Sequence, residues 1–130
     1  IGKPLMLMLL NATATVTVCH TRTKPEDLKT ACEEADIVIL ATGQIESYGP
    51  EFFREGQIIV DAGAGTGADG KMAGDLNAKA LTECDWSENV AYTPVPGGVG
   101  TVTTTLLLRN VMKAAKHFYK NENIKNLNTK

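Results

Sequence analysis

The chain has 130 residues, of which 43% are hydrophobic and 22% charged, so we expect one domain with a core rather than a disordered segment. Its formal net charge of -2, without a block of basic residues, argues against nucleic acid as a partner. No apolar run approaches the roughly 20 residues of a membrane span, so no membrane contact is expected. The cysteines, Cys19, Cys32 and Cys84, form neither a zinc pattern nor an even disulfide set, which predicts reduced thiols, no metal and a cytoplasmic location.

The N-terminal residues predict a short helix. Pro4 suits a first helical turn, residues 5–10 are all Leu or Met, and Asn11 suits the end. The apolar run lacks a basic leader and a cleavage site, so it is not expected to be a signal peptide. A helix that is apolar on all sides should be buried against a sheet. Because no strand precedes it, we expect the chain to be a fragment whose first strand is missing.

Residues 14–19 alternate Thr and Val, which predicts a strand that ends in the loop of His20 to Thr23. Thr23 and Glu26 have the spacing of a capping box, and Pro25 fits the first turn of a helix. Apolar residues then follow with helical spacing, at Leu28, Ala31, Cys32 and Ala35.

Three further apolar runs predict buried strands that alternate with helices. With residues 14–19, the expected parallel neighbours are residues 37–41, 58–61 and 90–92. Helices are expected at residues 50–54, 75–84 and after Thr103. This alternation predicts an α/β fold, a Rossmann-like doubly wound parallel sheet, over residues 1–120. Residues 121–130 are predicted to be a polar tail that frays.

The stretch 93–103 combines Pro94 and Pro96 with three glycines and leads into an apolar helix. The prolines fix the backbone, and the glycines permit torsions and close approaches that a side chain would block. Such a turn either presents backbone N–H groups to a ligand at a helix N-terminus or joins a strand tightly to a helix. The sharp turn makes the bond between Val95 and Pro96 a candidate cis peptide.

The run from Pro94 to Gly100, with Thr103 beyond it, resembles the C-terminal signature of the bifunctional methylenetetrahydrofolate dehydrogenase/cyclohydrolase (FolD) family. The family usually has Pro-Met where this chain has Thr101 and Val102. The resemblance implies NADP-dependent oxidation of methylenetetrahydrofolate, then hydrolysis of methenyl- to formyltetrahydrofolate, and a homodimer. The family's catalytic Tyr and Lys belong to an N-terminal domain that nothing here matches. The chain is therefore expected to supply cofactor determinants and no catalytic residue.

The loop after the strand expected at residues 14–19 indicates the cofactor. An NAD site usually places Asp or Glu there to bind the ribose hydroxyls, and this chain has neither. Thr21 offers a hydroxyl and Arg22 a charged fork suited to phosphate, which favours NADP. The alternative is that Arg22 is an ordinary surface residue. Thr21 also matches the Ser with which the family contacts NADP.

Glycines and one alanine complete the expected cofactor contacts. Residues 63–68 fit G-x-G-x-x-A, but a turn at Asp69 and Gly70 follows instead of a helix, so we do not expect a pyrophosphate loop there. Gly2 is the better candidate for approach to the pyrophosphate. The resemblance implies a backbone contact at Ala64, and the other strand ends offer Gly43 and Gly98.

The remaining polar residues allow more than one interpretation. Asp61 ends a strand and could be a base, although a structural hydrogen-bonding role is equally compatible, and Asp75 is predicted to cap a helix. His20 could be catalytic, but it has no acid or nucleophile nearby in sequence, which favours a positioning role or contact with solvent. The alternative functions are a fragment of another Rossmann dehydrogenase, such as a shikimate dehydrogenase-like one, and a non-catalytic nucleotide-binding module.

Overall fold

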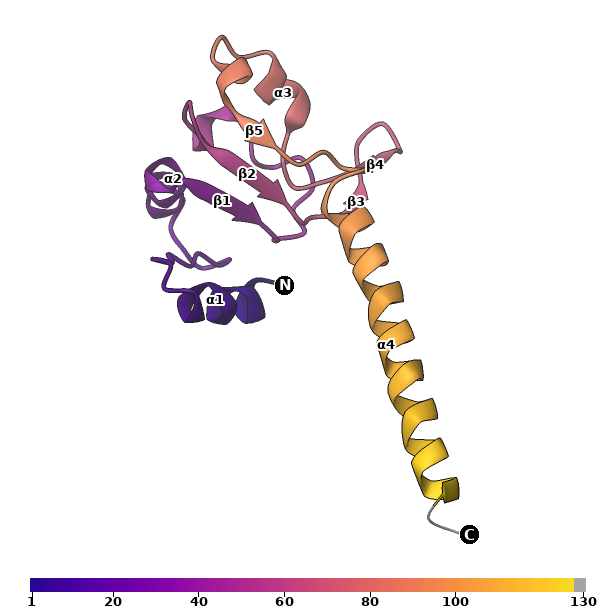
Figure 1. Cartoon of the computed structure of the whole chain (residues 1–130). Coiled ribbons are helices and arrows are strands. Elements are labelled where there is room, and N and C mark those ends of the chain that lie inside the picture. The colour runs from indigo at the N-terminus through magenta and orange to yellow at the C-terminus, as the bar shows by residue number, and fades with distance from the viewer. Residues whose placement is uncertain (128–130) are drawn as a thin grey trace. The chain divides into compact units, whose positions relative to one another are not determined.

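The fold is built on a three-stranded parallel sheet. The computed structural model describes the backbone of residues 1–127 and the side chains of residues 1–120. Strands β1 (Ile37–Leu40), β2 (Ile58–Asp61) and β5 (Ala91–Tyr92) lie in the order β1-β2-β5. Ile37 pairs with Ile58, and Ile58 with Ala91, both in parallel (Figure 1). These three strands confirm the predicted Rossmann-like α/β sheet.

Helices and one small hairpin connect the strands. The hairpin consists of β3 (Gly65–Thr66) and β4 (Met72–Ala73), which pair in antiparallel fashion. The helices are α1 (Gly2–Asn11), α2 (Pro25–Glu34), α3 (Ala78–Thr82) and α4 (Val99–Leu127), with 3-10 turns at η1 (Pro50–Phe52) and η2 (Ser87–Asn89). The helices predicted at residues 50–54 and 75–84 therefore form, in shorter versions.

The core lies against one face of the sheet. Val38, Leu40 and Ile59 point to that face and are buried with side chains of α2, of α3 and of the segment around η1. On the opposite face, Ile37 is 54% exposed and Ile58 is 46% exposed. The prediction that the strands are buried on both faces is therefore wrong. Apolar residues on both faces are typical of a sheet that helices cover on both sides, but here the packed elements cover one side.

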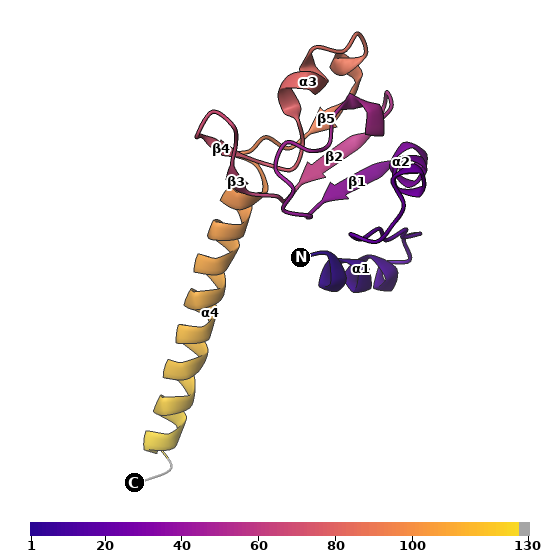
Figure 2. The same cartoon turned by 180° about the vertical axis from the view of Figure 1, so that it is seen from behind.

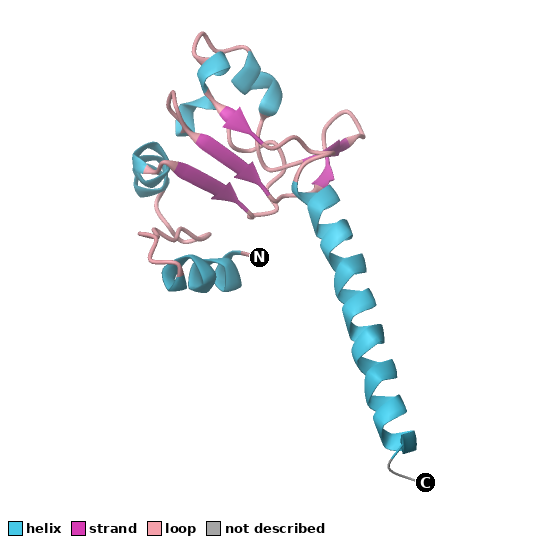
Figure 3. Ribbon diagram, in the orientation of Figure 1, coloured by secondary structure: helices cyan, strands magenta, loops and turns pink. Residues whose placement is uncertain are grey.

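The N-terminal segment differs most from expectation. Helix α1 forms, but none of its residues is buried, so its predicted burial is wrong. Residues 14–19 form a loop outside the sheet, not a strand (Figure 3). A strand exists only when a neighbour receives its backbone hydrogen bonds, and among the described residues the ladder partner of β1 is β2.

The predicted capping box of α2 is also wrong. The helix starts at Pro25 with Lys24 as N-cap, and no side chain caps it. The Thr23 hydroxyl instead accepts a hydrogen bond from the His20 N–H, at 2.9 Å, within the preceding turn. The alternative local bond wins because a Thr hydroxyl serves a turn as readily as a helix end.

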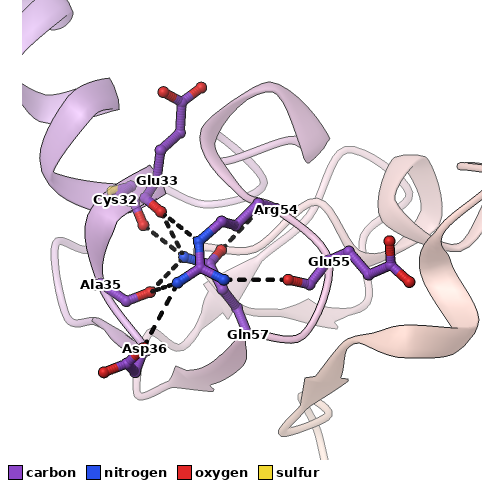
Figure 4. A network of polar contacts seen from close by, with 7 residues as sticks. All are labelled: Cys32, Glu33, Ala35, Asp36, Arg54, Glu55 and Gln57. Carbon is purple, nitrogen blue, oxygen red and sulfur yellow. Dashed lines mark hydrogen bonds and ion pairs between the residues drawn. The ribbon is translucent and has the colours of Figure 1, made fainter.

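The C-terminal end of α2 is fixed by side chains from the residues that precede β2 (Figure 4). The buried Gln57 donates from Nε2 to the carbonyls of Cys32, at 2.7 Å, and Ala35, at 2.6 Å. Its Oε1 accepts from the Arg54 N–H at 2.8 Å, and the Arg54 guanidinium donates to the Glu33 carbonyl at 2.7 Å. These residues satisfy carbonyls that a helix end leaves without intrahelical partners.

Residues 1–99 and 100–130 form two compact units, and the second consists of most of α4. Helix α4 begins at Val99, earlier than predicted, and its side chains over residues 101–120 are exposed. The predicted tail, residues 121–130, lies outside the described side chains, and the helical backbone ends at Leu127. In the described part of the chain, no helix combines the length and the apolar character needed to cross a bilayer.

Candidate functional site

The carboxyl ends of β1, β2 and β5 meet at one edge of the sheet because the strands are parallel. Figures 1 and 2 both show the β3–β4 hairpin just beyond the arrowheads of β1 and β2. The loops that leave this edge contain three of the predicted cofactor contacts, Gly43, Ala64 and Gly98. Ligands of open α/β sheets bind at such an edge, so we take it as the candidate site.

Asp75 holds the loop after β1. Its Oδ2 accepts hydrogen bonds from the Thr42 N–H at 2.6 Å, the Thr42 hydroxyl at 2.9 Å and the Gly43 N–H at 3.1 Å. The residue is fully buried, and its Oδ1 has no hydrogen-bond partner. The prediction that Asp75 caps a helix is wrong, because the N-cap of α3 is Asn77, whose Oδ1 accepts from the Ala80 N–H. Sequence patterns miss this role because Asp75 acts on residues more than thirty positions away.

Asp61 has the corresponding role at the end of β2. Its Oδ1 accepts from the N–H groups of Gly63, at 2.8 Å, and Asp75, at 3.2 Å, and its Oδ2 accepts from the Leu76 N–H at 2.9 Å. The side chain is 1% exposed. Of the two predicted roles, base or structural acceptor, the hydrogen bonds favour the second. We call Asp61 and Asp75 the carboxylate pair.

The carboxylate pair requires two glycines. A Cβ added at Gly63 would collide with the Asp75 carboxylate, and one added at Gly74 would collide with the Asp61 carboxylate. Asp75 therefore lies against Gly63, which follows Asp61 in the sequence, and Asp61 lies against Gly74, which precedes Asp75. No side chain fits at either position without moving a buried carboxylate.

Gly43 differs from these two because it faces open space. Its φ is +72°, in the left-handed region that favours glycine, and no atom lies within 4 Å of where a Cβ would stand. Its N–H is already bonded to Asp75. Gly43 can therefore offer a ligand its exposed Cα and carbonyl, but not a free N–H.

The glycine-rich residues 63–68 lead into the β3–β4 hairpin and not into a helix. The predicted turn at Asp69 and Gly70 is therefore confirmed, and the exclusion of a pyrophosphate loop there stays a prediction. A Cβ at Gly65 would press on Ile45, and one at Gly67 would lie 3.0 Å from Glu46 Oε2, which accepts from the Ala68 N–H at 3.3 Å. These glycines allow the hairpin to pack against the loop after β1.

The proline-glycine turn after β5 has the predicted cis peptide between Val95 and Pro96. Gly97 has a φ of +103°, and a Cβ at Gly98 would collide with the Pro94 carbonyl. The Thr93 hydroxyl accepts from the Asp61 N–H at 2.8 Å, which ties the turn to β2. Internal packing alone thus explains why Gly98 is a glycine.

Thr21 and Arg22 lie in an exposed turn. The Thr23 N–H donates to the His20 carbonyl at 2.8 Å, and the Arg22 N–H donates to His20 Nδ1 at 3.1 Å. His20 therefore accepts two hydrogen bonds within this turn, and its functional role stays a prediction. Within residues 1–120 the Arg22 guanidinium has no hydrogen bond or ion pair. Gly2, in the first turn of α1, is exposed with no atom near its Cα face. No described contact joins these three residues to the sheet edge.

A cavity of about 180 Å³ opens beside the carboxylate pair. Its lining mixes both charges, with Asp61 and Glu46 against Lys71 and Lys79, and includes Val95 of the turn. The volume is below the roughly 300 Å³ at which ligand pockets usually begin. The cavity alone is too small for a dinucleotide.

Comparison with known proteins agrees with this architecture. Residues 1–119 match the family model of the tetrahydrofolate dehydrogenase/cyclohydrolase, NAD(P)-binding domain. The bifunctional protein FolD of Clostridium perfringens is 47% identical over 113 residues, which cover 87% of this chain and 38% of that protein.

Solved structures give the same result. The FolD crystal structure from Campylobacter jejuni matches with a TM-score of 0.77 and 42% identity, over 90% of this chain and 39% of that one. The Trypanosoma brucei enzyme, complexed with NADP cofactor and inhibitor, matches with a TM-score of 0.73 and 33% identity, over 89% of this chain and 40% of that one. The chain thus spans about two fifths of the length of these relatives. It belongs to the tetrahydrofolate dehydrogenase/cyclohydrolase family, in the part that forms the NAD(P)-binding domain.

Proposed function

We propose that this chain is the cofactor domain of an enzyme that oxidises methylenetetrahydrofolate with NADP and hydrolyses the methenyl product to formyltetrahydrofolate. The observation that supports it best is the parallel sheet edge, where the loops after β1, β2 and β5 converge beside an exposed glycine backbone. The family match supplies the chemistry, since most of this chain aligns with the NAD(P)-binding domain.

The residues present fit a dinucleotide phosphate. Arg22 has an exposed guanidinium without a partner among the described residues, and Thr21 beside it offers a hydroxyl, so both suit the ribose phosphate. Gly2 and Gly43 have open Cα faces that permit close approach of the pyrophosphate and the nicotinamide ribose. Ala64 and Gly98 lie in the loops after β2 and β5 and are proposed as backbone contacts. NADP bound there would supply the acceptor for the hydride that leaves the methylene carbon of the folate.

The folate derivative is proposed to lie against the turn of residues 93–98. Gly98 packs tightly in this turn, because a Cβ there would collide with the Pro94 carbonyl, and the Asp61 carboxylate behind the turn accepts from the backbone N–H groups of Gly63 and Leu76. In this proposal the chain's role at that edge is to bind and orient. We further propose a homodimer in the cytoplasm, where free cysteines such as those of this chain stay reduced.

The proposal is tested by measuring the dissociation constants of NADP and NAD on the intact protein. Replacing Arg22 by Ala should weaken NADP binding by about ten- to a hundredfold, because a charge-assisted hydrogen bond is worth roughly 1.5–3 kcal/mol. NAD binding should stay nearly unchanged. The matched control is Lys24→Ala, which removes a positive charge from the same exposed turn.

Each result has a separate meaning. Equal weakening of both cofactors by Arg22→Ala would show that Arg22 does not recognise the phosphate. A wild type that binds NAD as well as NADP would refute the argument from the missing acid. A wild type that binds neither would refute the proposed function.

A further inference from the structure

The carboxylate pair has no assigned role, although its two side chains are among the most buried of the described residues. We propose that Asp75 is a positioning residue for the cofactor: it fixes the turn at Thr42 and Gly43 so that the Gly43 backbone faces the dinucleotide. This inference rests on the proposed function, because it assumes that a dinucleotide binds at this edge.

The geometry gives Asp75 control of that turn. One oxygen receives two N–H groups and one hydroxyl from Thr42 and Gly43, with distances of 2.6 to 3.1 Å. Hydrogen bonds to a carboxylate are about twice as strong as those between neutral groups. The turn also depends on this anchor because Gly43 stands at φ +72°, a conformation that glycine leaves easily.

Asp75 acts through the turn and not on the ligand. Its side chain has no exposed surface, whereas the position of a Gly43 Cβ lies in open space. A cofactor that touches Gly43 would therefore meet the turn and not the Asp75 side chain. This arrangement is that of a support behind a binding surface.

The second member of the pair extends the support to the next loop. Asp61 accepts from the N–H of Asp75 and from the N–H of Gly63, which precedes the proposed backbone contact at Ala64. A chain of hydrogen bonds therefore links the end of β2 to the end of β1. The two loops proposed to meet the nicotinamide half are held in one arrangement.

Stability alone does not account for a carboxylate at position 75. Its Oδ1 is buried without a hydrogen-bond partner, and such a group destabilises a fold. An amide could accept from Thr42 and Gly43 without burying a charge. The carboxylate is the stronger acceptor, and the atoms that it immobilises are those of the turn at the site.

The test compares Asp75→Ala and Asp75→Asn with wild type in the intact protein, by titration with NADP and with NAD. We expect Asp75→Ala to weaken both cofactors about tenfold and by equal factors, because the turn does not distinguish the ribose phosphate. Asp75→Asn keeps one acceptor for the turn and should lose less than about threefold. Arg22→Ala, in contrast, should change the ratio of the two constants.

The matched control is Gln57→Ala, which removes a side chain that is equally buried and bonded to backbone at the opposite end of β2. It should lower the melting temperature but leave both dissociation constants within twofold. Thr42→Val provides a second, milder variant if Asp75→Ala does not fold. It removes the hydroxyl donor to Asp75 and should weaken both cofactors about threefold.

The outcomes separate this inference from the proposed function. A wild type that binds neither cofactor overturns both. Tight binding by wild type with unchanged binding by Asp75→Ala, or by Thr42→Val where Asp75→Ala does not fold, overturns the positioning role and leaves the proposed function intact. Equal loss of affinity in Gln57→Ala would assign the effect to general destabilisation and overturn the positioning role as well.

Discussion

The two ends of strand β2 are held by opposite chemistry. Before the strand, the Gln57 amide and the Arg54 guanidinium donate to carbonyls at the end of α2. After the strand, Asp61 and Asp75 accept from backbone N–H groups of the loops. The side chain type at each end matches the backbone group that lacks a partner there, carbonyls at a helix C-terminus and N–H groups in turns.

The difference also separates stability from binding. At the amino end of β2 the polar groups bond to one another, and Gln57 is only 1% exposed (Figure 4). At the carboxyl end the buried carboxylates support a turn at which the Gly43 Cα faces open space. The same type of buried polar network therefore secures a helix at one end and shapes a surface at the other.

The largest expected loss of stability comes from the carboxyl end. Asp61→Ala leaves the N–H groups of Gly63, Asp75 and Leu76 without an acceptor. We expect the free energy of unfolding to fall by about 3–5 kcal/mol, since a buried unsatisfied donor costs about 1–3 kcal/mol. Urea denaturation measures this free energy, and the value for Asp61→Asn should lie between those of wild type and Asp61→Ala. A loss below about 1 kcal/mol would show that water replaces the carboxylate.

The amino end should respond less. Gln57→Ala removes the acceptor for the Arg54 N–H and the donor to two carbonyls at the end of α2. The Arg54 guanidinium still donates to one of these carbonyls, that of Ala35. We expect a fall of about 2–3 kcal/mol in the free energy of unfolding, from urea denaturation. The control, Gln44→Ala at an exposed position, should stay within about 0.5 kcal/mol. If Gln57→Ala and Gln44→Ala lowered the free energy of unfolding equally, the hydrogen bonds of Gln57 would contribute nothing to stability.

The smallest effect depends on pH and also belongs to the amino end. Burial, together with the charges of Cys19 and Glu33, raises the pKa of Cys32 from 9.0 to about 11. Because the folded state favours the neutral thiol, this contribution is complete below pH 9 and is lost as pH rises toward 11. We expect the stability difference between wild type and Cys32→Ala to shrink by about 1–2 kcal/mol between pH 8 and pH 10.5. Parallel pH curves for the two proteins would contradict the shift.

The sequence predicts elements whose signal is local. The apolar runs that became β1 and β2, the start of α2 at Pro25 and the cis peptide before Pro96 all follow from neighbouring residues. Burial of α1 and strand formation by residues 14–19 depend on what lies beside them in space, and there the predictions fail.

The carboxylate pair shows the same limit at the site. Nothing near Asp75 in sequence indicates that it bonds to Thr42, because the loops meet only when β1 and β2 pair. Asp75 therefore looked like a helix cap, the common role of an Asp a few residues before a helical segment. The exposed candidates Thr21 and Arg22 rest on residue chemistry, and they stay predictions.

The close fit of Gly63 against Asp75 and of Gly74 against Asp61 has an evolutionary consequence. A mutation that adds a side chain at either glycine is tolerated only if the facing aspartate has already become shorter, and that change removes its backbone bonds. Asp61, Gly63, Gly74 and Asp75 are thus epistatic, because a single substitution at any of them gives a poorly folded protein. We expect homologues either to keep all four residues or to change them together.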